Sequence, residues 1–169
     1  MHVARWRETA AGASLLAAGV LCAATAGLAA APTKSSELWA TVDLCNTPHH
    51  PDTIGIRGSM PGDGHAHDRM YMRFLVQNLD ASTHKWNNVG PSADSGFVQV
   101  GSAALARQAG RSFEFKPTAT TYTLRGQVEF QWHRDGHTTR SLTLPTTGGH
   151  TSLAGAEPAG FSAATCALP

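Results

Sequence analysis

Histidine side chains are the groups in this sequence most able to do chemistry. There are nine of them. His65 and His67 form a His-x-His pair, while His133 and His137 flank a segment that contains Asp-Gly. If successive strands run in alternating directions, both segments lie at the same end of the fold, and imidazoles brought together there suit zinc or copper. The sequence therefore supports two interpretations of these four residues: ligands of one metal ion, or solvated loop residues.

An aromatic side chain in a polar stretch is the second candidate. Trp86 lies within HKWNN, residues 84–88, which we expect to be a loop. A solvent-facing indole can stack on the face of a sugar ring, so Trp86 is a candidate carbohydrate contact. The alternative is that the ring covers the edge of a core, which is the more common use of an aromatic side chain.

Catalytic motifs are weak in this sequence, and its charge balance excludes one class of partner. Residues 160–164 read GFSAA, one residue away from the G-x-S-x-G elbow of hydrolases. That elbow joins a strand to a helix in an α/β sheet, a pattern that is missing here, so we expect no enzyme. Thirteen Lys and Arg stand against twelve Asp and Glu without a basic run. A nucleic-acid partner requires concentrated positive charge and is therefore not expected.

The first 31 residues read as a secretory signal peptide. Arg5 and Arg7 precede an uncharged stretch, residues 10–31, that is rich in Ala and Gly. A basic start, an apolar run and small residues before the cleavage point define such a leader. We place cleavage within residues 29–31, followed by a short linker over 32–37. The alternative is an uncleaved anchor, the one case in which a membrane is a partner.

Cysteine usage agrees with export. Cys22 leaves with the leader, and Cys45 and Cys166 remain near the two ends of the mature chain. Two cysteines in a secreted domain most simply pair with each other. Closing so long a loop stabilises the folded state by about 4–5 kcal/mol on the chain-entropy model. We therefore expect a structural disulfide between Cys45 and Cys166 in a secreted, extracellular protein.

Hydrophobic alternation with period two runs through most of the chain. It is clearest over residues 121–133, where one face carries Tyr122, Leu124, Gly126, Val128, Phe130 and Trp132. Such alternation predicts a strand with one buried face. Asp135-Gly136 then predicts a hairpin, and residues 138–144 form its returning strand. Further strands are expected over 38–44, 53–60, 69–77, 97–100, 112–115 and near 161–167.

This arrangement predicts an all-β fold. About seven short strands plus a C-terminal strand, separated by turn-forming residues, are typical of an antiparallel two-sheet sandwich. The order of strands and the Tyr-x-Leu start at Tyr122 resemble immunoglobulin-like and fibronectin type III-like domains. In those domains a tyrosine at this position hydrogen-bonds back to the preceding corner, which the resemblance implies for Tyr122. The second cysteine of true immunoglobulin domains is replaced by Leu124.

Three segments carry a closer resemblance. GRSFEF, YTLRGQVEFQWHRDG and EPAGFSAATC are similar to small secreted bacterial β-sandwich proteins with no assigned activity. The resemblance covers about residues 38–168 and supplies no catalytic residues. The length that remains without the leader is that of one domain, which we place over residues 38–169. We expect a secreted non-catalytic module that needs no cofactor and binds a protein or carbohydrate, or serves a structural role, at the cell surface or in the medium. The alternative is a secreted protein that binds zinc or copper through its histidine cluster.

Overall fold

The computed structural model describes residues 36–150 and 154–169. The chain divides into two units, Met1–Thr33 and Lys34–Pro169, and only the second contains described residues. The predicted signal peptide and residues 32–35 of the predicted linker lie outside this part of the chain. No helix among the described residues is long and apolar enough to cross a membrane.

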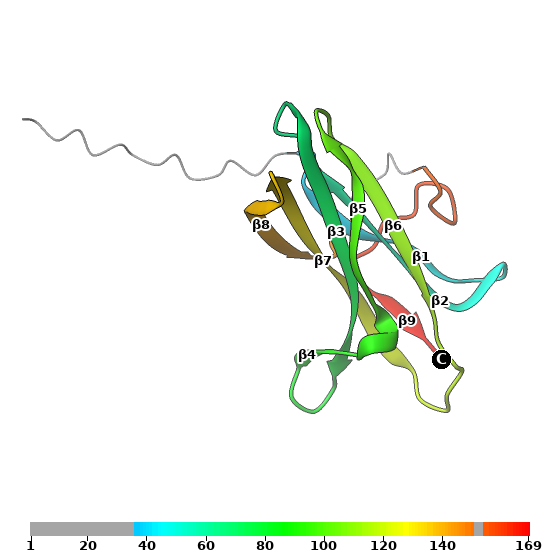
Figure 1. The fold of residues 1–169 in the computed structure, drawn as a ribbon. Coiled ribbons are helices and arrows are strands. Elements are labelled where there is room, and N and C mark those ends of the chain that lie inside the picture. Colours follow the sequence, from blue (N-terminus) through cyan, green and yellow to red (C-terminus); the bar gives the residue numbers. More distant parts are fainter. Residues whose placement is uncertain (1–35, 151–153) are drawn as a thin grey trace, which may run out of the picture. The chain divides into compact units, whose positions relative to one another are not determined.

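In the described part of the second unit the regular elements are strands, apart from one short turn of 3₁₀ helix, η1 (Pro91–Ala93). The strands are β1 (Trp39–Thr47), β2 (His50–Met60), β3 (His65–Asp80), β4 (Lys85–Asn88), β5 (Asp94–Ala103), β6 (Arg107–Glu114), β7 (Tyr122–Arg134), β8 (His137–Pro145) and β9 (Cys166–Leu168). One sheet has the order β1-β2-β6. The other has the order β4-β3-β7-β8, with β5 also paired to β3 and β9 to β7. All pairings between these strands are antiparallel (Figure 1), which confirms the all-β two-sheet architecture.

The core lies between the two sheets, and alternation determines which side chains enter it. The inward rows of β3 and β7 are in register, with Met72 opposite Phe130 and Phe74 opposite Val128. Ile54 and Ile56 of β2 belong to the same buried cluster. Burying a large apolar side chain contributes roughly 1.5–3 kcal/mol. The predicted inward face of residues 121–133 is thereby confirmed, except at its first residue, Tyr122, which is 39% exposed.

The predicted disulfide is confirmed. Cys45 in β1 is bonded to Cys166 in β9, and their Cα atoms are 5.5 Å apart. Since β9 pairs with β7, the bond links the smaller sheet to the larger one. It also fixes the last residues of the chain against the start of β7, where Tyr122 is opposite Leu168. A disulfide of this kind is compatible with an extracellular protein.

Two predictions about individual segments were wrong, the loop at residues 84–88 and the extent of the last strand. The HKWNN stretch is not a loop, because β3 continues to Asp80 and a tight turn returns the chain as β4. The last strand is shorter than expected and begins at Cys166. Before it, Ala163 forms only an isolated bridge with Val42 of β1.

Candidate ligand-binding pocket

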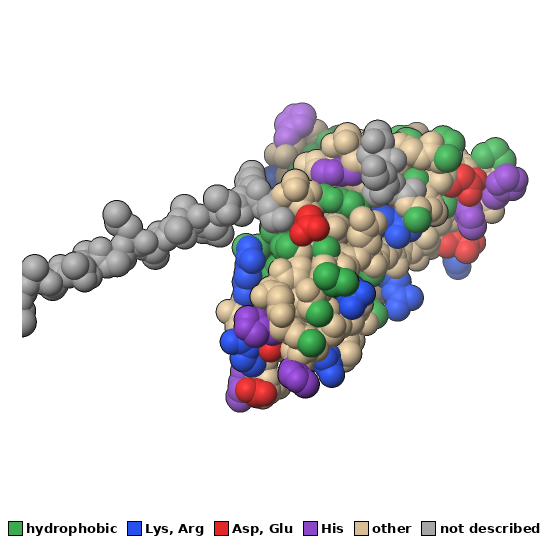
Figure 2. Space-filling model, turned by 90° about the horizontal axis from the view of Figure 1, so that it is seen from above, with side chains coloured by type: hydrophobic (Ala, Val, Ile, Leu, Met, Phe, Trp, Pro, Cys, Tyr) green, Lys and Arg blue, Asp and Glu red, His purple; other side chains and the backbone are tan. Residues whose placement is uncertain are grey.

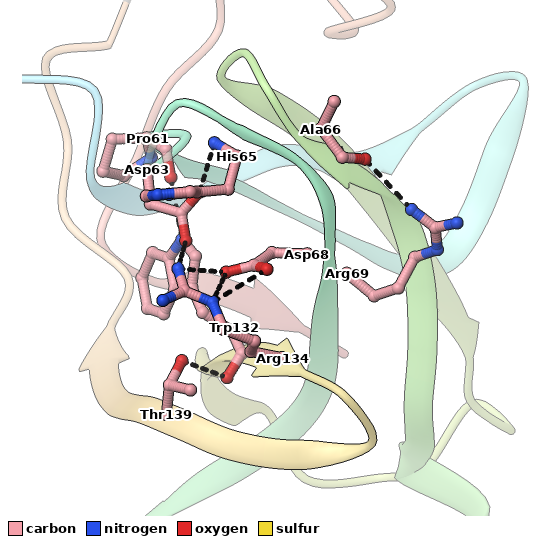
Figure 3. Close-up of polar contacts among 9 residues, drawn as sticks. All are labelled: Pro61, Asp63, His65, Ala66, Asp68, Arg69, Trp132, Arg134 and Thr139. Atoms are coloured by element: carbon pink, nitrogen blue, oxygen red, sulfur yellow. Dashed lines mark hydrogen bonds and ion pairs between the residues drawn. The ribbon is translucent and has the colours of Figure 1, made fainter.

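The histidine-bearing segments lie at one end of the larger sheet, as the alternating strand directions predict. His65 and His67 lie at the start of β3. His133 is the last residue but one of β7, and His137 is the first residue of β8. Side-chain contacts join these segments. The Arg134 guanidinium is 2.7 Å from a carboxylate oxygen of Asp68, and the Trp132 indole N–H donates to the Pro61 carbonyl at 2.9 Å (Figure 3).

The structure does not gather the four histidines at one point. Among the described residues, the ligand-type atoms that lie within 4.8 Å of one another belong to Asp63, His65 and Asp68. The His133 ring instead packs 4.5 Å from the ring of Tyr71 and bonds the Gln131 side chain at 2.8 Å. Figure 2 shows histidine side chains at several separate places on this end of the unit. A four-histidine metal centre therefore stays a prediction.

The protein's own arginine already neutralises the acidic pair in this cluster. Arg134 donates to both oxygens of Asp68 and lies 3.8 Å from the Asp63 carboxylate (Figure 3). The hydrogen bonds from Arg134 hold the pKa of Asp68 below its ordinary value. A metal ion would have to displace this guanidinium to reach both carboxylates.

Trp86 lies on β4 and is half-buried. The Arg125 guanidinium sits 4.4 Å from the centre of a Trp86 ring, a cation–π distance. Burial lowers the pKa of Arg125. One face of the indole is thus covered by the chain itself, and the predicted sugar contact at Trp86 remains a prediction.

A pocket of about 420 Å³ opens at the other end of the sheets, where β4 and the C-terminus lie in Figure 1. Its lining is mainly apolar with several polar groups, and the lining residues come from β2, β3, β4, β7, β9 and the segments after β4 and β6. The lining residues are Asp52, Asn78, Asn87, Asn88, Val89, Phe115, Lys116, Thr118, Tyr122, Leu124, Leu168 and Pro169.

The pocket forms because the inward rows of the core end in side chains that cannot fill it. On β3 the apolar row ends at Val76, and the next inward position is Asn78. Asn78 is opposite Leu124 of β7. The inward-facing row of β7 begins two residues before Leu124, at Tyr122. A polar amide among apolar walls resists close packing because its hydrogen-bonding groups need partners.

The amide of Asn78 is the group in the pocket that points most directly to a ligand. Its Oδ1 atom is buried and accepts no hydrogen bond from any described residue. It is the only buried side-chain polar atom in the described part of the chain without a partner. Leaving such an atom unpaired costs about 1–3 kcal/mol. The Cβ–Cγ torsion has broad wells, so rotation can present either end of the amide to the pocket.

Neighbouring polar groups of the lining are held in place by the backbone. Asp52 has a left-handed backbone conformation, with φ of 51°, and its N–H donates to Asn46 Oδ1 at 2.9 Å. Its carbonyl accepts the Phe115 N–H at 2.9 Å. Asn88 Oδ1 accepts from Gln77 Nε2 at 2.9 Å, which fixes the orientation of that amide. The pocket rim is therefore preorganised.

Tyr122 does not behave as the resemblance implies. Its hydroxyl forms no hydrogen bond with the described residues, and its exposed ring lines the pocket instead. The sequence pointed to neither this use of Tyr122 nor the pocket. The available signal was Asn78, which stands where the alternation of residues 70–76 calls for another apolar side chain.

No protein-family model matches the chain, and neither does any curated protein or solved structure. The function therefore has to be inferred from the fold and from the pocket.

Proposed function

We propose that this protein is a secreted, non-catalytic module of the immunoglobulin-like type that binds a small amphipathic molecule in the pocket between β4 and β9. The observation that carries this proposal is the buried, unpartnered amide oxygen of Asn78 beside a pocket with apolar walls. Pockets that bind small organic ligands combine such walls with a few well-placed polar groups, and they occupy about 300–1,000 Å³.

Export is supported by two features of the chain. The disulfide between Cys45 and Cys166 is of a kind that persists in oxidising compartments. The N-terminal sequence has the composition of a cleavable leader. Ligand capture in the medium or at the cell surface follows from this location.

The test uses a neutral apolar dye, N-phenylnaphthylamine, whose fluorescence rises in apolar surroundings. Val89 is 41% exposed at the pocket, so Val89→Trp fills the mouth without entering the core. Phe97 is 42% exposed on β5 outside the pocket, so Phe97→Trp is the matched control. We expect the dye to bind the wild type and the control and to lose at least about tenfold in affinity for Val89→Trp. Equal binding by both variants would overturn the proposal.

Metal binding at the opposite end is the second candidate, favoured by the approach of Asp63, His65 and Asp68 within 4.8 Å. Zinc titration by calorimetry tests it on the wild type and on a His65→Ala/His67→Ala variant. Because Arg134 pairs with Asp68 and lies near Asp63, we expect the same heat from both proteins. Heat that only the wild type produces would establish the metal function.

A further inference from the structure

We infer that the ligand of this pocket is a zwitterion with an apolar body and an internal amide, the chemistry of a short apolar peptide with both ends free. This inference rests on the proposed function and specifies its ligand. Three properties of the lining favour such a ligand: its charges, its amides and its apolar walls.

The charged side chains among the lining residues are one carboxylate, that of Asp52, and one ammonium group, that of Lys116. Within the described part of the chain, neither side chain takes part in an ion pair, and the two do not pair with each other. Other carboxylates of the described residues are paired with arginine, as Asp43 is with Arg57 and Asp94 with Arg73. A ligand with one positive and one negative end satisfies both groups, whereas a ligand with a single charge satisfies one and faces the other as a like charge.

Three asparagines, Asn78, Asn87 and Asn88, are also among the lining residues. The side-chain oxygen of Asn88 is already bonded to Gln77 Nε2, which leaves the amides of Asn78 and Asn87. A primary amide offers both donors and an acceptor, which is the complement of a peptide group. Asn78 and Asn87 are opposite each other in the β3–β4 register, so their side chains lie on the same face of adjacent strands. The buried Asn78 oxygen requires an N–H or O–H donor, and the N–H of a peptide bond is one.

The remaining walls are apolar. Leu124 and Leu168 are nearly fully buried, while Tyr122 and Val89 are partly exposed at the mouth. Apolar ligand side chains placed against these walls are removed from water, at about 25 cal/mol per Å² of buried surface. A polar peptide or a sugar lacks this contribution, so the walls favour an apolar peptide.

The experiment compares the dipeptide Leu-Phe with its blocked form, acetyl-Leu-Phe-amide, as competitors of the bound dye and by direct calorimetry. The two probes share the apolar body and the internal amide, and only Leu-Phe has charged ends. We expect Leu-Phe to bind at least about tenfold more tightly, because each end gains a charge-assisted hydrogen bond.

Two variants assign the charges. Asp52→Asn keeps a residue that tolerates the left-handed backbone conformation, and Lys116→Gln keeps most of the side chain. Each is expected to weaken Leu-Phe about fivefold while leaving the blocked form unchanged, since rim charges are partly screened by water. The controls are Asp135→Asn and Lys85→Gln, which make the same chemical changes outside the lining and should change nothing.

The outcomes separate the two levels of the proposal. If the dye binds in the pocket but Leu-Phe and its blocked form bind equally, the zwitterion inference is wrong and the binding function stands. If the pocket binds neither the dye nor either peptide, both are wrong. Tighter binding of Leu-Phe that Asp52→Asn and Lys116→Gln reduce, and the controls do not, supports both.

Discussion

At the scale of single residues, Asn78 is a position where the proposed ligand binding and the packing of the core favour different side chains. Alternation along β3 places Met70, Met72, Phe74 and Val76 in the core, and the same face then presents an amide. The sequence is sufficient to predict the apolar row, because burial of alternate side chains depends only on residue type and period. It is insufficient to predict that the amide oxygen lacks a partner, which depends on distances to other strands.

Replacing Asn78 separates stability from binding. Asn78→Leu removes the buried unpaired oxygen and extends the apolar row, so we expect the free energy of unfolding to rise by about 1–2 kcal/mol. Binding of Leu-Phe should weaken at least about tenfold, because the ligand loses its polar contact. Urea unfolding and calorimetry on the same variant measure the two effects. A variant that is less stable and binds normally would contradict this role for Asn78.

We expect His150 to make the stability of the protein depend on pH. Its ring stacks on Trp39 at 4.7 Å, and burial lowers its pKa below the ordinary value of 6.5. The unfolded chain therefore takes up a proton at higher pH than the folded chain does. The free energy of unfolding therefore keeps its maximal value, as far as His150 is concerned, above the pKa of this imidazole in the unfolded chain. It falls as the pH drops below that pKa.

The variant His150→Gln isolates this contribution from those of the other histidines. Urea unfolding from about pH 7.5 to about pH 5 should show a smaller loss of stability for His150→Gln than for the wild type. Parallel curves for the two proteins would show that His150 is protonated equally easily in both states.

At the scale of elements, β4 is the strand that sequence reasoning missed. It has only four residues, three of them exposed, so it lacks the alternation by which strands are recognised. Its position is set by the turn before it. Asp80 Oδ1 accepts hydrogen bonds from the Ser82 hydroxyl at 2.6 Å and from the Ser82 and Thr83 N–H groups at 2.8 and 3.1 Å. These bonds lower the pKa of Asp80 to about 2.

Loosening this turn should loosen the pocket. Asp80→Ala removes the acceptor for three hydrogen bonds, so β4, which carries Asn87 and Asn88, is expected to exchange its amide hydrogens several-fold faster. Ligand binding should weaken by a few-fold, because the rim is less preorganised. Asp80→Asn retains an oxygen acceptor and is the control. Equal exchange in Asp80→Ala and the wild type would show that β4 is held by its pairing with β3 alone.

At the scale of the whole second unit, the disulfide connects architecture to the pocket. Cys166 is two residues from Leu168 and three from Pro169, both of which line the pocket. The cysteine positions were sufficient to predict the bond, and the alternation of apolar residues between turn-forming segments was sufficient to predict the two-sheet fold. They were insufficient to predict the pocket, because its lining comes from segments as distant as Asp52 and Pro169, and their meeting depends on sheet register.

Removing the bond tests this connection. The double variant Cys45→Ser/Cys166→Ser should lose about 4 kcal/mol in the free energy of unfolding, on the chain-entropy model for a long loop. Under conditions in which it remains folded, it should bind Leu-Phe more weakly, because β9 is less firmly held against β7. Retained affinity in the folded double variant would mean that the pairing of β9 with β7 suffices to shape the pocket.

The most direct test of ligand binding is an NMR titration of the isotope-labelled protein with Leu-Phe, observed at the side-chain amide of Asn78. The binding proposal predicts large, saturable shifts of these signals and of Asn87, with none at Trp132 or His137 at the opposite end of the sheet. The proposal would be contradicted if Leu-Phe saturated the protein and the Asn78 signals did not move, or if the shifts were centred on the histidine-bearing end.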